Sequence, residues 1–414
     1  MLFNYIGFKK IVRDVFLGLY ALQLCNYIIP IIIIPIIISH IGLADYGELM
    51  YITSIYQVSS LFIDFGFTYT APVVASRYRD NECKLQQYYS KIIFIKFILF
   101  AIVITFILLM SFFSVLNLTP MYILSIFLCA LGNVLMPLWL FQGTGNFKLL
   151  SISQIISRVT LFIVLILYLL GGGVNIFIIS LLQNSTLVLC YISLNRKIYK
   201  INKDDINFKE CFLEFKKAGN VFIGVLGTIG YGGLIPILIG NYCGNSSLAV
   251  YSIIQKLTTA CQSLITPVSQ FMLSEVSRDS IKKDFLLRIR KSFYIHLIIS
   301  SLACLCYLVL GQFVAKIIGK VDVPFTIIAT ASIITIFSSL NNVLGVQLLI
   351  PTDNVKSLRS ANLISGILVV SLSWYFITYY NVLGGVILNL MGEFLVFLFL
   401  LNIAKRVWMG YVSD

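Results

Sequence analysis

Four long segments without a single charged residue most constrain what this chain can fold into. No Asp, Glu, Lys or Arg occurs in residues 97–147, 159–195, 218–255 or 360–392. A helix that crosses the hydrocarbon core of a bilayer needs about 20 mostly apolar residues, so each segment has room for at least one crossing. The sequence therefore predicts an all-α integral membrane protein.

The composition and the first residues agree with this class. Hydrophobic residues make up 59% of the chain and charged residues 11%, whereas soluble domains carry roughly 25% charged residues. Lys9, Lys10 and Arg13 precede an apolar stretch from Val15 to about Ile38. That stretch is longer than the apolar region of a cleavable signal peptide, so it is expected to stay as the first span.

The hydrophobic pattern predicts about twelve transmembrane helices. Their expected ranges are 15–38, 46–72, 91–114, 120–143, 148–170, 174–195, 218–240, 247–275, 292–315, 323–350, 355–379 and 382–404.

The positions of Lys and Arg predict the orientation. Cytoplasmic loops of membrane proteins are enriched in these residues. With twelve alternating spans, 25 of the 30 Lys and Arg residues fall on the side of the two termini, and only Lys316 and Lys320 fall on the other. Both termini of this multi-pass protein are therefore expected in the cytoplasm. Topology also explains the net charge of +13 better than nucleic-acid binding does.

The longest loop divides the chain into two six-span halves. We expect an N-terminal lobe in residues 1–194, a cytoplasmic linker in 195–217 and a C-terminal lobe in 218–414. A short internal match supports related halves: the sequence Leu-Ala-x-Tyr-small follows the first span of each half, at residues 43–47 and 248–252.

Four charged residues inside predicted spans are candidate site residues: Asp64, Arg158, Lys256 and Glu393. A charge near the bilayer centre costs about 2.5–3.5 kcal/mol on insertion scales, so it is expected to face a partner or a wet cavity. Two interpretations stay open. Asp64 could pair with Arg158, and Lys256 with Glu393, as structural contacts; alternatively, the two basic residues bind an anionic headgroup. Lys96, five residues after Lys91, is expected to extend its ammonium to the membrane surface.

Polar side chains extend these positions into stripes at helical spacing. Gln57 and Ser60 precede Asp64, Ser151 and Gln154 precede Arg158, and Asn389 lies one turn before Glu393. Two further stripes are Lys256, Thr259, Ser263, Pro267 and Gln270, and Ser332, Thr335, Ser339 and Asn342. Ser and Thr in membrane helices commonly bond to their own helix, but stripes on several spans favour a shared polar cavity suited to sugar hydroxyls.

Motifs for catalysis or metal binding are missing from the sequence. It contains no phosphate-binding loop, dinucleotide fingerprint or His-Glu-x-x-His. The nine Cys form no Cys-x-x-Cys, and the two His, His40 and His296, lie in distant segments. The chain is expected to have no cofactor, no metal and no enzymatic activity.

Several short motifs resemble those of the O-antigen flippases of the Wzx type, in the polysaccharide-transport branch of the MOP superfamily, to which the MATE transporters also belong. They are Ile41-Gly42-x-x-x-Tyr46-Gly47, Asp64-Phe65-Gly66-Phe67, Trp139-Leu140-Phe141-Gln142-Gly143 and Gly345 to Pro351. The resemblance covers essentially the whole chain. It implies two six-helix, MATE-like lobes that open alternately to either side of the membrane.

The resemblance also implies a function. The substrate would be an O-antigen repeat unit on undecaprenyl diphosphate, moved from the cytoplasmic to the periplasmic leaflet for lipopolysaccharide biosynthesis. Expected partners are an O-antigen polymerase, a chain-length regulator, and protons or sodium as coupling ions. Two alternatives remain: a cation-coupled drug or metabolite antiporter of the same superfamily, and an O-antigen polymerase, which is an enzyme. Membrane charges of both signs argue against the first, and short outer loops against the second.

Overall fold

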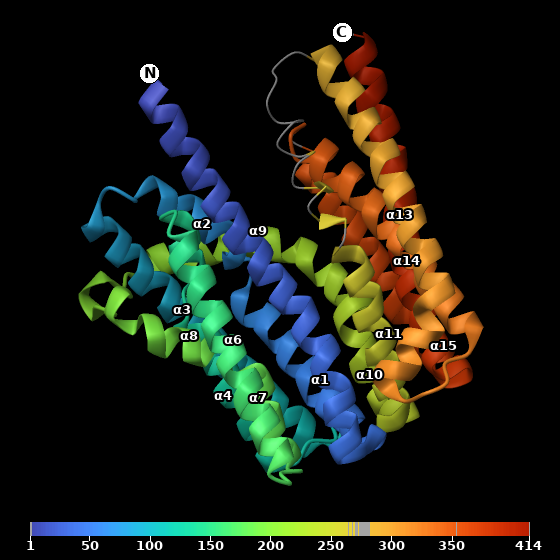
Figure 1. The fold of residues 1–414 in the computed structure, drawn as a ribbon. Coiled ribbons are helices and arrows are strands. Elements are labelled where there is room, and N and C mark those ends of the chain that lie inside the picture. Colours follow the sequence, from blue (N-terminus) through green and yellow to red (C-terminus); the bar gives the residue numbers. More distant parts are fainter. Residues whose placement is uncertain are drawn as a thin grey trace. The chain divides into compact units, whose positions relative to one another are not determined.

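The computed structural model describes residues 2–263, 265–266, 268–269, 272, 282–352 and 354–413. Among these residues, side chains are described for residue 29 and for residues 31–407, except 196, 203 and 282–284. This part of the chain is helical apart from turns and short loops, and it contains no strand (Figure 1). The prediction of an all-α protein is therefore confirmed.

The helices follow the chain in a simple order. They are α1 (Leu2–Asp64), α2 (Phe67–Arg77), α3 (Glu82–Phe112), α4 (Pro120–Leu135), α5 (Leu138–Gly143), α6 (Phe147–Leu170), α7 (Ile176–Asn184), α8 (Thr186–Leu194), the 3₁₀ turns η1 (Asn195–Lys197) and η2 (Lys203–Asp205), α9 (Phe208–Thr228), the π-helical η3 (Ile229–Gly233), α10 (Leu234–Cys243), α11 (Asn245–Ser263), α13 (Lys282–Gly319), α14 (Phe325–Asn341), the π-helical η4 (Asn342–Leu349) and α15 (Val355–Ser413).

The two longest helices are each broken once. α15 has 59 residues, or about 90 Å at 1.5 Å per residue, three times a hydrocarbon core of about 30 Å. Non-helical backbone at Asn381 (φ 49°, ψ −126°) divides it, and Gly42 (φ 86°, ψ 170°) divides α1 in the same way. Each of these helices therefore provides two segments of membrane-spanning length.

The chain is a multi-pass membrane protein. Among the described residues, eight helices are long and apolar enough to cross a membrane, or nine if α7 and α8, bent by 50°, form one span. The count of twelve spans stays a prediction.

Outward-facing apolar stripes match a lipid environment. On α3, Ile98, Ile102, Phe106 and Leu109 are exposed at helical spacing. On α13, a second exposed stripe consists of Ile298, Leu302, Leu305, Val309 and Phe313. Contiguous apolar surface of this kind is rare on soluble monomers and normal against lipid.

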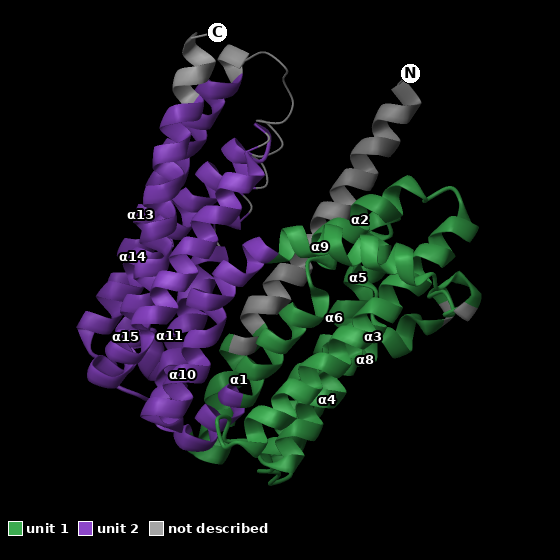
Figure 2. Cartoon of the chain, turned by 180° about the vertical axis from the view of Figure 1, so that it is seen from behind, with its two compact units in different colours: residues 1–42, 52–222 green, residues 43–51, 223–414 purple. Residues whose placement is uncertain are grey.

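The chain divides into two compact units (Figure 2). Unit 1 consists of residues 1–42 and 52–222, and unit 2 of residues 43–51 and 223–414. Residues 43–51 belong to unit 2 because they pack on it closely. The Tyr51 hydroxyl donates to Asn241 Oδ1 at 2.6 Å, and a Cβ on Gly47 would lie 1.8 Å from the carbonyl oxygen of Asn245. The lobe boundaries at residues 194 and 218 stay a prediction.

In unit 1, α4 packs against α3, α7 and α8, and α6 packs against α7 and α8. The short helix α5 lies against α2. This contact requires Gly143, because a Cβ there would lie 2.5 Å from the Cβ of Ala75. Trp139, at the start of the same motif, is buried against Tyr88 with ring centroids 5.6 Å apart. The Trp139–Gly143 motif therefore has a packing role in unit 1.

In unit 2, α14 packs between α13 and α15, and η3 and α10 pack against α15. The backbones of α9 and α15 meet at glycines. A Cβ on Gly227 would lie 2.2 Å from the backbone of Asn362, and one on Gly366 would lie 2.4 Å from the oxygen of Gly227. Small residues allow membrane helices to approach this closely.

Candidate functional site

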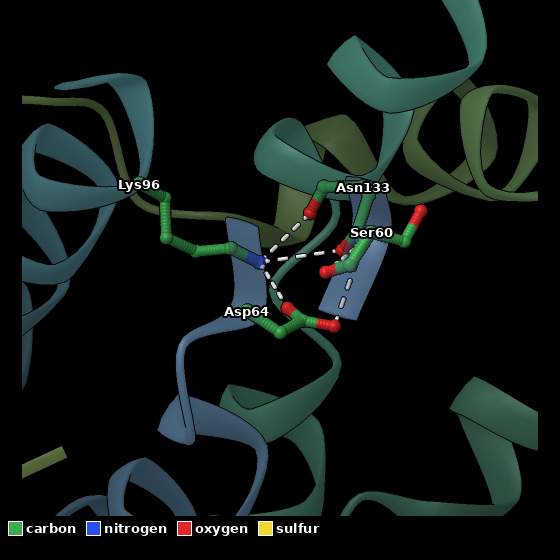
Figure 3. A network of polar contacts seen from close by, with 4 residues as sticks. All are labelled: Ser60, Asp64, Lys96 and Asn133. Atoms are coloured by element: carbon green, nitrogen blue, oxygen red, sulfur yellow. Dashed lines mark hydrogen bonds and ion pairs between the residues drawn. The ribbon is translucent and has the colours of Figure 1, made fainter. Parts of the chain in front are cut away.

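A buried ion pair in unit 1 involves one of the predicted site residues (Figure 3). Lys96 Nζ, on α3, donates to Asp64 Oδ1 at 2.8 Å and to the backbone oxygen of Asn133 at 2.9 Å. Asn133 Nδ2 in turn donates to Asp64 Oδ2 and to the backbone oxygen of Ser60, each at 3.4 Å. Lys96 is 2% exposed and Asp64 28% exposed. The expectation that Lys96 reaches the membrane surface is therefore wrong.

Two interrupted helices explain why this ion pair forms here. The carbonyl of Asn133 would normally accept from the residue four positions later, but that residue is Pro137, which has no N–H. Lys96 satisfies the freed carbonyl near the negative end of the α4 dipole. Asp64 is the last residue of α1, because Phe65 (φ 43°) and Gly66 (φ 83°) adopt left-handed backbone.

The motif Asp64-Phe65-Gly66-Phe67 thus marks a helix break. A Cβ on Gly66 would lie 2.6 Å from the oxygen of Ala218, so the break also brings α1 close to α9. Phe65 stacks on Phe215 with ring centroids 4.4 Å apart, and Phe67 is buried.

None of the hydrogen bonds described above for this ion pair involves the other predicted site residues of unit 1. Gln57 is exposed on α1, and Gln154 and Arg158 are half-buried on α6. Asp64 pairs with Lys96, a partner that the sequence does not predict.

In unit 2, Glu393 on α15 also has an unforeseen partner. Asn341 Nδ2 donates to Glu393 Oε2 at 2.7 Å and to the Glu393 backbone oxygen at 2.9 Å. Lys256 is half-buried on α11, and among the described residues no carboxylate forms an ion pair with it. Asn389 is half-buried one turn before Glu393. The pairing of Lys256 with Glu393 is therefore not formed.

The polar stripes divide into two kinds of residue. Thr259, Ser263, Ser332 and Thr335 donate to carbonyls of their own helices. Ser339 and Asn342 instead line a cavity of about 350 Å³ in unit 2. Pro267 and Gln270, expected on the Lys256 stripe, lie outside the described residues.

The sequence does not predict this cavity as a separate site. The described residues of its wall are Gln262, Ile265, Thr266, Ser269, Ser338, Ser339, Asn342 and Val346. Behind the wall, His296 contacts Ser269 at 2.8 Å between Nε2 and Oγ. The sequence does not indicate a role for His296, which lies far from His40. Its partners are serines that come together only in the folded unit.

Comparison with known proteins identifies the family. The family model described as "Polysaccharide biosynthesis protein" matches residues 11–273.

The chain belongs to the polysaccharide biosynthesis protein family.

Two relatives match this chain along almost their whole length. A proposed O-antigen transporter of Escherichia coli (strain K12) is 25% identical over 389 residues, covering 91% of this chain and 92% of the relative. A proposed O-antigen transporter of Shigella dysenteriae is 24% identical over 403 residues, covering 94% and 98%. The resemblance to O-antigen flippases is therefore confirmed.

Solved structures show the same fold. The lipid II flippase MurJ, in an inward closed conformation, matches with a TM-score of 0.74 at 15% identity over 93% of this chain and 87% of that one. An inward-facing MATE-family multidrug resistance transporter of the MOP superfamily matches with a TM-score of 0.72 at 11% identity, covering 95% and 96%. The expected MATE-like membrane fold is confirmed.

Proposed function

We propose that this protein is a flippase that moves an undecaprenyl-diphosphate-linked O-antigen repeat unit from the cytoplasmic to the periplasmic leaflet. The observation that carries the proposal is the match to two proposed O-antigen transporters over more than 90% of this chain and of each relative. The fold shared with a lipid II flippase supports it, because that fold handles a lipid-linked substrate in that protein.

Physical chemistry explains why such a substrate needs a protein. Moving an ionised diphosphate and its sugars into hydrocarbon without compensation costs on the order of tens of kcal/mol, so spontaneous flipping is negligible. A protein that offers polar and basic groups at membrane depth lowers this cost for the headgroup, while the polyprenyl tail stays in lipid. Alternating access then moves the headgroup between the two leaflets.

Our assignment of site residues follows the charges. In this proposal Arg158 and Lys256 contact the diphosphate or an acidic sugar. For Lys256 the support is that no carboxylate among the described residues forms an ion pair with it. The carboxylates of Asp64 and Glu393 balance charge or couple transport to protons or sodium. Asp64 has the weaker case for direct substrate binding, because Lys96 already neutralises it. Gln57, Gln154 and Asn389 complete the proposed polar lining.

We place the protein in a bacterial inner membrane with both termini in the cytoplasm, beside an O-antigen polymerase and a chain-length regulator. A strain that lacks the gene provides the test. Lipid-linked repeat units should accumulate where an enzyme added to the periplasmic side cannot reach their sugars, and the wild-type gene should reverse this.

Two other outcomes would favour the alternatives. Repeat units that reach the periplasmic leaflet and stay unpolymerised would indicate a polymerase. Unchanged repeat-unit pools together with increased drug sensitivity would indicate a drug antiporter, which the MATE fold also accommodates.

A further inference from the structure

The cavity in unit 2 is lined by uncharged side chains wherever the structure describes its wall. Of the eight described lining residues, six carry hydroxyl or amide groups and two are aliphatic. Its volume of about 350 Å³ lies at the lower end of the range for small-molecule sites, about 300–1,000 Å³.

The wall contains an unused hydrogen-bonding group. Ser339 is 5% exposed, and its Oγ has no hydrogen-bond partner among the described residues. The buried Ser332 and Ser373 donate to their own helices, at 2.8 Å and 2.7 Å, whereas Ser365, which is also buried, lacks a partner among the described residues but does not line the cavity. Because a buried hydroxyl without a partner carries a desolvation cost, Ser339 is suited to a polar ligand that would supply one.

Buried hydrogen bonds hold two other wall residues from behind. His296 is fully buried, and its Nδ1 lies 2.9 Å from the backbone oxygen of Ser292. A carbonyl only accepts, so Nδ1 carries the proton, and in the neutral imidazole Nε2 must accept from Ser269 Oγ. The lone pairs of Ser269 are then left for the cavity, which makes this residue an acceptor.

A second chain of contacts from Ser292 reaches Asn342. Ser292 Oγ donates to Gln347 Oε1 at 2.6 Å, and Gln347 Nε2 donates to Asn342 Oδ1 at 3.5 Å. The amide N–H groups of Asn342 are therefore left for the cavity. Ser292, His296 and Gln347 are all fully buried, so the membrane-embedded protein maintains a polar network at this depth.

We propose that this cavity is a subsite for an uncharged sugar ring of the lipid-linked oligosaccharide, with Ser269 accepting, Asn342 donating and Ser339 completing the contacts to sugar hydroxyls. The assignment rests on the proposed flippase function and adds the class of group that this unit recognises. Ile265 and Val346 line the same cavity, and in this proposal they contact the C–H surface of the ring.

Saturation-transfer NMR on the full chain in lipid nanodiscs tests the subsite with glucose, galactose and N-acetylglucosamine as neutral probes and N-acetylneuraminic acid as the acidic comparison. We expect at least one neutral sugar to receive saturation and the acidic sugar to receive less. Ser339→Ala should weaken neutral-sugar binding about five- to ten-fold, the loss expected for one hydrogen bond. The matched control is Ser332→Ala, on the same helix and away from the cavity.

The Ser339→Ala variant is expected to fold, since its hydroxyl has no partner to lose. Val346→Phe, which fills the cavity, should abolish binding and gives a second check. The subsite is refuted if no neutral sugar binds the wild type, or if Ser339→Ala binds like Ser332→Ala.

A flipping measurement on the same variants separates this result from the general function. If the wild type flips lipid-linked repeat units and Ser339→Ala matches Ser332→Ala in binding and in rate, the subsite fails and the flippase function stands. If the wild type flips nothing, the flippase function fails whatever the sugars do.

Discussion

The ammonium of Lys96 lies 2.8 Å from the carboxylate of Asp64, and the two side chains differ in how much of their surface is exposed. Lys96 is almost fully buried, while more than a quarter of the Asp64 side chain is exposed. A charge that loses its partner destabilises the fold most where it cannot be hydrated. The two residues of this pair should therefore respond unequally to mutation.

Asp64→Ala leaves a buried ammonium and should lower the free energy of unfolding by about 3–5 kcal/mol. Lys96→Met leaves the more exposed carboxylate, so its effect should be about half as large. The double variant should recover part of the loss, because it leaves neither charge unpaired. Thermal unfolding of the purified protein in detergent measures all three.

The matched control for this cycle is Lys316→Met. Lys316 pairs with Asp322, and their side chains are 66% and 82% exposed; exposed pairs contribute at most about 1 kcal/mol. Equal losses for Asp64→Ala and Lys316→Met would contradict the buried role of the Lys96–Asp64 pair.

Gly42 and Gly244 adopt nearly the same unusual backbone, with φ/ψ of 86°/170° and 82°/172°. This region is essentially restricted to glycine. We expect Gly42→Ala and Gly244→Ala each to lower the unfolding free energy by about 1–3 kcal/mol, although a Cβ at either position would meet nothing within 4 Å.

Gly232→Ala is the matched control for these glycines. A Cβ there also meets nothing within 4 Å, but its φ is not positive. It should leave the melting temperature nearly unchanged. If all three variants melt alike, backbone conformation is not what Gly42 and Gly244 provide.

Arg158 and Lys256 are expected to affect transport more than folding. If each makes a charge-assisted contact to the headgroup, worth about 1.5–3 kcal/mol, then Arg158→Ala and Lys256→Ala should slow flipping roughly 10- to 150-fold. Arg158→Lys and Lys256→Arg should retain part of the rate. The measurement is the rate at which lipid-linked repeat units become accessible from the periplasm, at equal amounts of protein in the membrane.

Lys316→Ala provides the control for transport. Lys316 forms an exposed ion pair with Asp322 at the end of α13, and both side chains are more than 60% exposed. Its removal should leave the rate unchanged. A normal rate in Arg158→Ala would remove that residue from the proposed site.

Cysteine labelling can test the predicted orientation. In a chain that keeps Cys83 alone, a membrane-impermeant maleimide should label spheroplasts only after permeabilisation, because Cys83 is exposed in a predicted cytoplasmic loop. A chain whose single cysteine comes from Asp322→Cys should be labelled in intact spheroplasts. The reverse pattern would invert the assigned topology.

The sequence predicted the membrane class and the helical fold because both depend on local composition. The charge-free segments correspond to helices, and Gly42 and Asn381 break α1 and α15 near the expected outer loops. The interruptions within helices were harder to predict. Hydrophobic periodicity does not distinguish the π-helical segments η3 and η4 from the α-helices that they adjoin.

The site could be predicted only in part. Helical spacing identifies the polar stripe that runs from α14 to the first residue of η4. It does not show that the first two residues of the stripe bond to their own helix while the last two line a cavity. The sequence alone places Lys96 near the surface, because Lys91 lies only five residues before it. Its true partners, Asp64 and the carbonyl freed by Pro137, come from other helices.

The empty space around Gly42 and Gly244 has a consequence for how such sequences can diverge. A harmful change in a packed core can be offset by a second change in the residue it touches. Here no side chain touches the added methyl group, so no neighbouring substitution can compensate for an alanine. In relatives that are only about a quarter identical to this chain, residues that touch each other can change in pairs. At these two positions no such pair exists, so each lineage has to keep glycine or rebuild the turn.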